Sequence, residues 1–270
     1  MCRPSHYTVA YEINPWMSLR RKPNRTRAAL QWDHLYRTLT RTLGVRVRLV
    51  PPRAGVPDLV FTANAGLVHG RTVVRSNFRF SQRQREEPIM ERFFRAARFR
   101  VVTLNRRYGF EGEGDALWAG STLVFGFRYR SDAGAHEELA RILKARVLPV
   151  ELADTRFYHL DTCFAPLDAR TGVWFPKAFD RYGRRVLEHL MPDLIAVTEA
   201  DAKRFVCNAI PVPAPAGAKD GPGGRVVVQA GLSKALARRI ERRRFALYPV
   251  DLSEFLKAGG SAKCLVLRLG

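Results

Sequence analysis

The chain has 270 residues, 46% of them hydrophobic, and carries a formal net charge of +21. Its length fits one or two domains, and no run approaches the roughly 18 apolar residues needed to cross a membrane. The N-terminus lacks the basic and apolar segments of a secretion signal. The four cysteines form no CxxC pair, which excludes a zinc ribbon or redox dithiol and favours reduced thiols in the cytoplasm.

The positive charge comes mainly from arginine, because eight of the 46 basic residues are lysine and the remaining 38 are arginine. Such an excess is compatible with a nucleic-acid surface. The arginines are scattered along the whole chain, however, and no zinc-finger spacing or RNP-like aromatic motif accompanies them. We therefore expect no nucleic-acid partner, and a basic nucleic-acid-binding protein stays only as an alternative from another class.

The first half of the chain predicts alternating strands and helices. In order, they are strands over 45–50, 58–63 and 66–75 (the last two joined by a turn at Asn64–Ala65), a helix over 86–98 with Pro88 in its first turn, a strand over 100–104, a strand pair over 116–127 around Gly120, a helix over 135–143 and a strand over 147–150.

The second half repeats this order. It predicts strands over 163–167 and 172–175, a helix over 181–190, a strand over 194–197, strands over 205–210 and 225–229 across a Pro/Gly-rich loop at 211–224, a helix over 233–243 capped by Ser233, a strand over 247–250, a helical turn over 253–258 and a strand over 264–269. The unit of two strands, a helix and a strand recurs about every 50 residues, which indicates four or five similar modules. If the array closes into a ring, side chains at one end of each module converge.

Cys264 is the first candidate for a nucleophile. It follows Gly259 and Gly260 and precedes an apolar segment, so a glycine turn can hold it accessible, and the adjacent Lys263 can lower its pKa. The alternative is a small buried core residue, as most free cysteines are. Cys163 competes for the role, but an apolar strand begins directly after it without a glycine turn.

Several polar side chains accompany this thiol. His159 and Asp161 stand two residues apart, so an extended segment would place them on one face, although a histidine satisfied by backbone is the alternative. Glu111, Glu113 and Asp115 alternate with glycines in FEGEGD, an anionic loop that suits a metal or a guanidinium, or is merely a solvated turn. The loop lacks the ligand spacing of a calcium site.

Cysteine together with histidine indicates covalent attack on an electrophilic carbon, followed by proton transfer. Carboxylates around that carbon indicate a cationic substrate. The central carbon of a guanidinium meets both conditions.

Four segments, in this order, resemble the motifs of the guanidine-modifying, or amidinotransferase, superfamily: FTAN at 61–64, FEGEGD at 110–115, HLDTC at 159–163 and GGSAKC at 259–264. The likeness covers nearly the whole chain as one domain and is nearest to arginine dihydrolases and dimethylarginine dimethylaminohydrolases. It implies a five-bladed α/β propeller of ββαβ modules around a central active-site channel. It also implies a hydrolase of C–N bonds in linear amidines that needs no metal or organic cofactor.

The resemblance further implies roles for individual residues. Cys264 is the expected nucleophile and His159 the general acid and base, while Glu111 and Asp161 are expected to hold the guanidinium. The other expected substrate-binding residues are Arg83, at the substrate carboxylate, and Asn64, Asn14 and Asp115.

Deiminases of this superfamily carry aspartate where this chain has Asn64, which favours an arginine dihydrolase that forms ornithine, ammonia and carbon dioxide. One alternative is a dimethylarginine dimethylaminohydrolase, which releases citrulline and methylamine. Another is an amidinotransferase, in which an amine replaces water. The sequence leaves a homo-oligomer open.

Overall fold

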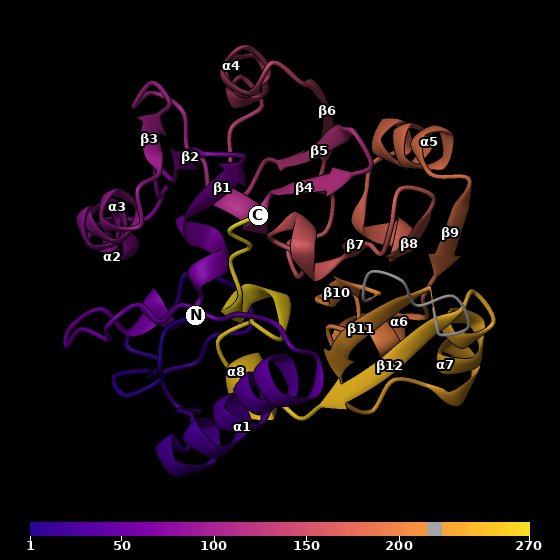
Figure 1. Ribbon diagram of the computed structural model, residues 1–270, viewed down its shortest axis with the longest axis horizontal. Helices are drawn as coiled ribbons and strands as arrows, with labels where there is room; N and C mark the ends of the chain where they lie inside the picture. Colours follow the sequence, from indigo (N-terminus) through magenta and orange to yellow (C-terminus); the bar gives the residue numbers. More distant parts are fainter. Residues whose placement is uncertain (215–222) are drawn as a thin grey trace.

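Four three-stranded sheets and one helical sector surround a common centre in the computed structural model, which describes residues 1–214 and 223–270 (Figure 1). Each sheet forms one module, in which two antiparallel strands are followed by a helix and by a third strand parallel to the second. The helix that follows the second strand of each module lies on the outside of the ring, and the first strands lie toward its centre (Figure 1). This repeat confirms the module order predicted from the sequence.

The modules follow one another in chain order. Module 1 has β1 (Gly66–His69), β2 (Thr72–Arg75), α2 (Ser81–Gln84), α3 (Glu87–Ala96) and β3 (Arg100–Thr103); module 2 has β4 (Ala116–Ala119), β5 (Thr122–Phe127), α4 (Ala135–Leu143) and β6 (Arg146–Glu151). Module 3 has β7 (Phe164–Pro166), β8 (Thr171–Trp174), α5 (Arg181–Leu190) and β9 (Asp193–Ala196); module 4 has α6 (Glu199–Lys203), β10 (Ile210–Pro213), β11 (Gly224–Gln229), α7 (Lys234–Glu241) and β12 (Phe245–Val250).

The helical sector joins the two ends of the chain. It contains α1 (Arg25–Arg37) and α8 (Ser253–Leu256), and its only β pairing among the described residues is the isolated bridge between Cys2 and Val50. The described residues therefore form four sheets and not five, so the five-blade count implied by the resemblance remains a prediction.

Several elements match the sequence prediction closely. The helices expected over 135–143 and 181–190 are α4 and α5, and the strand pair over 116–127 is β4 with β5. Ser233 caps α7 as predicted, since its hydroxyl accepts a hydrogen bond from the Leu236 N–H. The capping and apolar spacing of these segments are local, so their sequence alone determines them.

Other predictions were wrong. Residues 58–63 form 3₁₀ turns, and the hairpin lies within 66–75; segments 45–50 and 264–269 contain no strand; and residues 205–208 turn before β10 begins. Short apolar runs are buried in either conformation, so their periodicity does not distinguish a strand from a turn. Part of the predicted 211–224 loop lies outside the described residues.

Helix α1 was missed, although its pattern is regular. Asn24 caps it by accepting a hydrogen bond from the Arg27 N–H, and it buries Ala28, Gln31, Trp32 and Leu35. These positions follow the i, i+3, i+4, i+7 spacing of one helix face. The many arginines around these positions make the buried helix face hard to recognise in the sequence.

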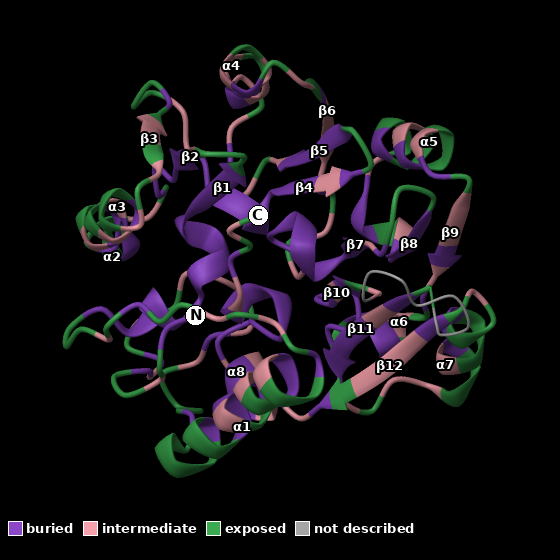
Figure 2. Cartoon of the chain, viewed as in Figure 1, coloured by how far each residue is buried: buried purple, intermediate pink, exposed green. Residues whose placement is uncertain are grey.

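Four short 3₁₀ turns, called here the inner turns, face the centre of the ring: Thr62–Ala65, Gly112–Gly114, Leu160–Thr162 and Lys263–Leu265. The first three lead directly into β1, β4 and β7, and neighbouring inner turns contact one another. Figure 2 shows the central elements buried and the outer helix faces exposed. The four sequence motifs are therefore brought together by the inner turns, three of which precede modules 1 to 3 while the fourth lies in the helical sector.

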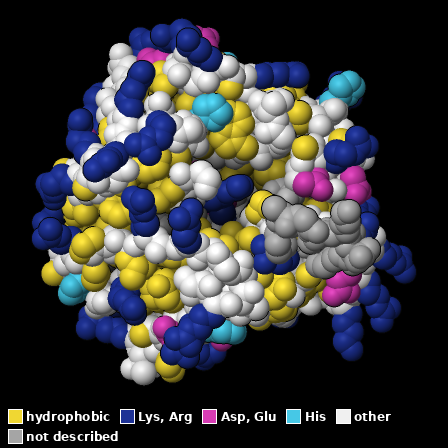
Figure 3. All heavy atoms as spheres, viewed as in Figure 1, with side chains coloured by type: hydrophobic (Ala, Val, Ile, Leu, Met, Phe, Trp, Pro, Cys, Tyr) yellow, Lys and Arg dark blue, Asp and Glu magenta, His cyan; other side chains and the backbone are white. Residues whose placement is uncertain are grey.

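Lysine and arginine side chains are spread over the face seen in Figure 3 and do not gather into one stripe there. In the described parts of the chain, no helix is long and apolar enough to cross a membrane.

Candidate active site

A small cavity lies between the inner turns and the N-terminal segment. Of the residues predicted from the sequence, Cys264, Asn64, Arg83 and Asn14 line it. The other lining residues are Ile13, Met17, Asp58, Phe61, Arg130, Tyr158, Ala258 and Gly260. The cavity therefore combines a thiol with two guanidinium groups, a carboxylate and two amides.

Cys264 lines this cavity and is 2% exposed. Its Sγ donates a hydrogen bond to Asp161 Oδ2 at 3.4 Å and accepts one from Asn208 Nδ2 at 3.1 Å. Burial, together with the nearby Asp161 carboxylate, raises the pKa of the Cys264 thiol well above its ordinary value. Without a bound cation, the group is therefore a thiol near neutral pH.

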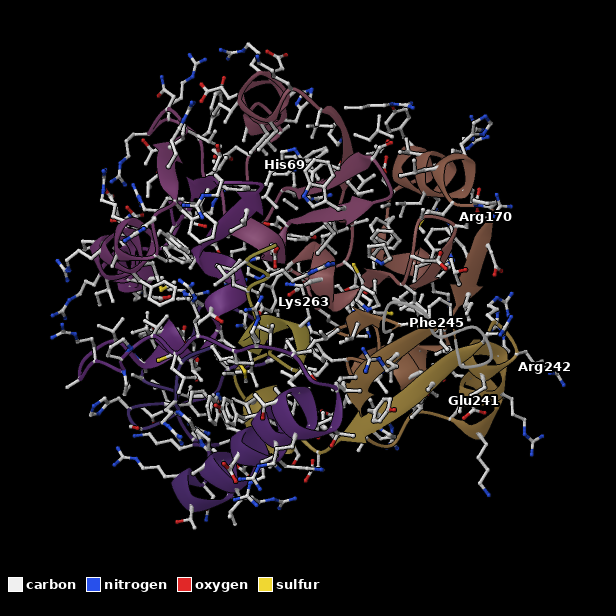
Figure 4. All side chains as sticks on the ribbon, viewed as in Figure 1. His69, Arg170, Glu241, Arg242, Phe245 and Lys263 are labelled. Atoms are coloured by element: carbon white, nitrogen blue, oxygen red, sulfur yellow. The ribbon has the colours of Figure 1, made fainter. Side chains whose placement is uncertain are left out.

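The glycine turn before Cys264 is real. Gly259 has φ +77°, and the Tyr158 hydroxyl donates a hydrogen bond to its carbonyl at 2.8 Å. The turn holds the thiol without exposing it to bulk solvent. Lys263 does not serve the thiol, because its ammonium donates to Glu113 Oε2 at 2.7 Å; Figure 4 shows Lys263 near the centre of the ring.

His159 and Glu111 form a buried pair with Arg130. Glu111 Oε2 accepts a hydrogen bond from His159 Nε2 at 2.8 Å and another from Arg130 at 3.0 Å. Burial would raise the pKa of Glu111, but Arg130 and His159 outweigh it and lower the pKa to about 2. Burial lowers the pKa of His159 to about 4, although Glu111 opposes the change. A carboxylate thus orients a neutral imidazole that can accept a proton.

The amide of Asn64 has a fixed orientation. Its Oδ1 accepts a hydrogen bond from the Arg83 guanidinium at 2.8 Å, and a guanidinium can only donate. The Nδ2 group must therefore face away from Arg83; it is buried and has no hydrogen-bond partner among the described residues. Asn64 Nδ2 consequently offers a ligand two donors.

Three buried polar atoms at or beside the cavity lack a partner among the described residues: Asn64 Nδ2, Asp58 Oδ1 and Asp161 Oδ1. Unpaired buried polar atoms destabilise a fold, and most are satisfied in native proteins. One donor and two carboxylate acceptors around a thiol therefore fit a ligand that carries both cationic N–H groups and an oxygen.

The inner turn Gly112–Gly114, which packs against Asn64 and His159, requires glycine at both ends. A Cβ at Gly114 would overlap Asn64 Nδ2 and lie 3.2 Å from the His159 ring. At Gly112, which has φ +56°, a Cβ would overlap the backbone of Gly66. The two glycines of FEGEGD thus permit the close approach of neighbouring inner turns.

The three carboxylates of FEGEGD do not act together, because each faces a different partner. Glu111 pairs with His159, Glu113 with Lys263, and Asp115 accepts hydrogen bonds from Ser131 Oγ and the Leu160 N–H. No group of three or more His, Cys, Asp and Glu side chains within residues 1–214 and 223–270 is placed to hold a metal ion.

Two predicted substrate-binding residues have other contacts. Asp115 does not line the cavity. It accepts hydrogen bonds from the Leu160 N–H, next to His159, and from Ser131 Oγ, which in turn accepts one from the Glu111 N–H. Asn14 lines the cavity, but its side chain accepts from Trp16 and Met17 and donates to Ala258. Both side chains therefore shape the site through their neighbours. Cys163 is fully buried in the hydrophobic core and does not line the cavity.

Sequence reasoning missed Arg130, Asn208 and Asp58. Arg130 lies among many arginines, so nothing local distinguishes it; its guanidinium stands 4.8 Å from the Phe80 ring centroid and 4.7 Å from that of Tyr158. Asn208 had a signal, because it stands two residues before β10 as Asn64 stands two residues before β1.

Asp161→Asn is expected to stabilise the chain at pH 8 by about 1–3 kcal/mol. Burial raises the pKa of Asp161 from 3.8 to about 7, with Lys263 opposing. The native state therefore binds more protons than the unfolded state between these values, and stability falls as pH rises through that window. An amide does not have this dependence.

Urea denaturation at pH 5 and pH 8 measures the effect. The advantage of Asp161→Asn should grow with pH, and the matched change Glu137→Gln on the exposed face of α4 should show no such growth. An advantage of equal size at both pH values would contradict the assigned ionisation.

The known proteins that this chain resembles are named for reactions of arginine or dimethylarginine. A family model for eukaryotic N,N-dimethylarginine dimethylhydrolase matches residues 11–269. The bifunctional arginine dihydrolase/ornithine cyclodeaminase ArgZ of Synechocystis sp. is 42% identical over all of this chain and 37% of its own length. The N(G),N(G)-dimethylarginine dimethylaminohydrolase of Mycobacterium tuberculosis is 38% identical over all of this chain and 84% of its own. The chain thus spans little more than a third of the first relative.

Solved structures agree with these relatives. The N-terminal domain of ArgZ, in a cysteine-to-serine variant bound to substrate, is 40% identical with a TM-score of 0.90 and covers all of this chain and 96% of that one. A cysteine-to-alanine variant of AgrE with L-arginine is 42% identical with a TM-score of 0.92 and covers all of this chain and 40% of that one. The α/β fold of repeated modules is therefore the one these enzymes have.

Proposed function

The chain belongs to the dimethylarginine dimethylaminohydrolase-like family of guanidine-modifying enzymes, and on this basis we propose that it is an arginine dihydrolase. It would attack the guanidinium carbon of L-arginine through Cys264 and form ornithine, carbon dioxide and two molecules of ammonia. The observation that carries this choice is the unpaired Asn64 Nδ2 group beside the thiol.

The guanidinium is held by carboxylates on two sides. Asp161 Oδ1 has no other partner, and Glu111 keeps its charge because its pKa is low. Carboxylate and guanidinium form planar charge-assisted hydrogen bonds, which place the central carbon beside the Cys264 sulfur. Water leaves the site as the substrate enters.

The amino-acid end of the substrate meets the other charges of the cavity. Arg83 makes four hydrogen bonds and Arg130 two, so Arg130 has more N–H groups left for a substrate carboxylate. Asp58 Oδ1 is unpaired and suits the α-ammonium group. Arg83, expected from the resemblance at the carboxylate, would mainly fix Asn64 and contribute its remaining donor.

The first reaction uses the thiol and the imidazole. The substrate cation favours ionisation of Cys264, whose proton passes to the neutral His159. The thiolate adds to the guanidinium carbon, and a C–N bond breaks as His159 returns the proton to the departing ammonia. His159 then takes a proton from water, whose oxygen bonds to the carbon while the C–S bond breaks. General acid–base catalysis of this kind is worth about 10²–10⁴-fold.

The ureido product differs from arginine by one carbonyl oxygen, which can only accept hydrogen bonds. Asn64 Nδ2 is a donor, so it retains this oxygen in the site for a second attack. The second cycle releases the remaining terminal nitrogen as ammonia and leaves a carbamate. The carbamate loses carbon dioxide to give ornithine.

Incubation of the whole chain with L-arginine, dimethylarginine, agmatine and citrulline tests the proposal. We expect two ammonia per arginine with ornithine as the amine product, and no turnover of agmatine, which lacks the carboxylate. One ammonia with citrulline as the end product would contradict the second hydrolysis. Turnover that needs an added amine acceptor would indicate an amidinotransferase.

The second candidate is a dimethylarginine dimethylaminohydrolase, which the family match over residues 11–269 favours. It uses the same catalytic residues and would release dimethylamine and citrulline from N,N-dimethylarginine in the same incubation. For either enzyme we place the chain in the cytoplasm, since all four cysteines are free and buried.

A further inference from the structure

We propose that Asn208 is a positioning residue that fixes both the sulfur and the backbone of Cys264 for attack. The inference rests on the proposed function, because it takes Cys264 as the nucleophile. It adds a residue from module 4, which supplies no other group to the proposed reaction.

The carboxamide of Asn208 is fully buried, and its oxygen and nitrogen form hydrogen bonds with Cys264 and Asp161. Asn208 Oδ1 accepts a hydrogen bond from the Cys264 N–H at 3.1 Å. Its Nδ2 donates to Cys264 Sγ at 3.1 Å and to the Asp161 carbonyl at 3.0 Å. The Asn208 carbonyl accepts from the Lys263 N–H at 3.2 Å, so the main chain is joined as well.

These partners allow only one orientation of the amide. A backbone N–H can only donate and a backbone carbonyl can only accept, so Oδ1 must face Cys264 N and Nδ2 must face the Asp161 carbonyl. The second proton of Nδ2 is then directed at the sulfur. The hydrogen-bond partners on the backbone therefore determine that Asn208 donates a proton to the sulfur.

A donor directed at sulfur favours the thiolate over the thiol, because the charged form is the stronger acceptor. The other groups at the sulfur act in both directions: Asp161 disfavours the thiolate, and the Ser261 backbone favours it. The Lys263 ammonium is turned toward Glu113. Asn208 is therefore the side-chain donor that touches the sulfur among the described residues.

The repeat supports a site role for this position. Asn208 stands two residues before β10, and Asn64 stands two residues before β1. Both end a single hydrogen-bonded turn, since the Asn64 N–H donates to Phe61 and the Asn208 N–H to Phe205. Equivalent positions of two modules thus present an asparagine amide toward the cavity and its thiol.

Asn208→Leu tests the proposal, with Gln31→Leu as the matched control. Gln31 is also a buried carboxamide with all its groups bonded, but it joins α1 to α8 through Asp251, Ser253 and Glu254. Both changes replace a bonded amide by an apolar group of similar size, so both are expected to lower stability. Only Asn208→Leu removes a donor from the sulfur.

The first readout is alkylation of Cys264 by iodoacetamide between pH 7 and 10, followed by mass spectrometry of its peptide. Loss of a hydrogen bond to a charged group should raise the thiol pKa by about one to two pH units. Because the remaining thiolate is more nucleophilic, the expected decrease in rate is about 3–10-fold at each pH. Gln31→Leu should alkylate at the wild-type rate.

The second readout is turnover of arginine, where kcat should fall by about 10–100-fold in Asn208→Leu and KM by less than about 3-fold. Asn208→Asp keeps the shape and the acceptor for Cys264 N–H, but it loses the donor and adds a negative charge beside the sulfur, so it should slow alkylation at least as much as Asn208→Leu does. Unchanged alkylation in Asn208→Asp, or an equal decrease in Gln31→Leu, would overturn the proposal. Alkylation does not depend on which guanidine is the substrate, so failure of the proposed function is recognised separately.

Discussion

Cys264→Ser should abolish release of ammonia from arginine, with a loss of at least about 10⁴-fold in kcat, while the chain folds normally. A serine hydroxyl fits the space of the thiol, but His159 is a weak base here because burial lowers its pKa to about 4. The neutral hydroxyl would therefore stay protonated beside the bound guanidinium. Ammonia assays measure the loss, and isothermal titration with arginine should still detect binding.

The control is Cys163→Ser, the sequence-level competitor. Cys163 is fully buried and its sulfur donates to the carbonyls of His159 and Leu160, so a serine there keeps these contacts and should retain most activity. Activity that persists in Cys264→Ser and disappears in Cys163→Ser would show that the nucleophile is misassigned.

Asn64→Asp should change the product rather than stop the reaction. A carboxylate at 64 would pair with Arg83 and accept hydrogen bonds from a guanidinium, but it would offer no donor to a ureido oxygen. The first hydrolysis should continue while citrulline leaves the site. Ammonia released per arginine should fall from two towards one, and citrulline should accumulate.

Chromatography of the amino acids, with ammonia counted in the same samples, gives this ratio. Asn105→Asp makes the same chemical change outside the cavity, and it should leave two ammonia per arginine. If Asn64→Asp still forms ornithine with two ammonia, the amide donor is not what distinguishes a dihydrolase from a deiminase.

The sequence predicted the module order and singled out several of the side chains that line the cavity or contact its lining, because both depend on local signals. Helices such as α4 and α5 follow from capping and apolar spacing, and the motifs around Glu111, His159 and Cys264 are compact. Their convergence was expected from the repeat together with the ring closure that the resemblance implied. Arg130 and Asn208 could not be predicted in the same way, since their roles come from contacts with residues of other modules.

The conformation of the inner turns was also beyond sequence reasoning. Residues 58–63 are buried and mostly apolar, as a strand would be, yet they form 3₁₀ turns, and Asn64 in the second turn accepts a hydrogen bond from Arg83. The segment 264–269, predicted as a strand, likewise begins in the 3₁₀ turn Lys263–Leu265. Local pattern determines burial, whereas the neighbouring module determines the direction of the chain.

In the proposed site each module contributes at least one group, so the site requires the four modules and the helical sector to pack together. Asn64, Glu111, His159, Asn208 and Cys264 lie far apart along the chain, and the last of them enters from its C-terminal end. Pairings of such long sequence separation form late and slowly during folding. Recovery of turnover after dilution from denaturant therefore reports complete assembly, and secondary structure should return before it.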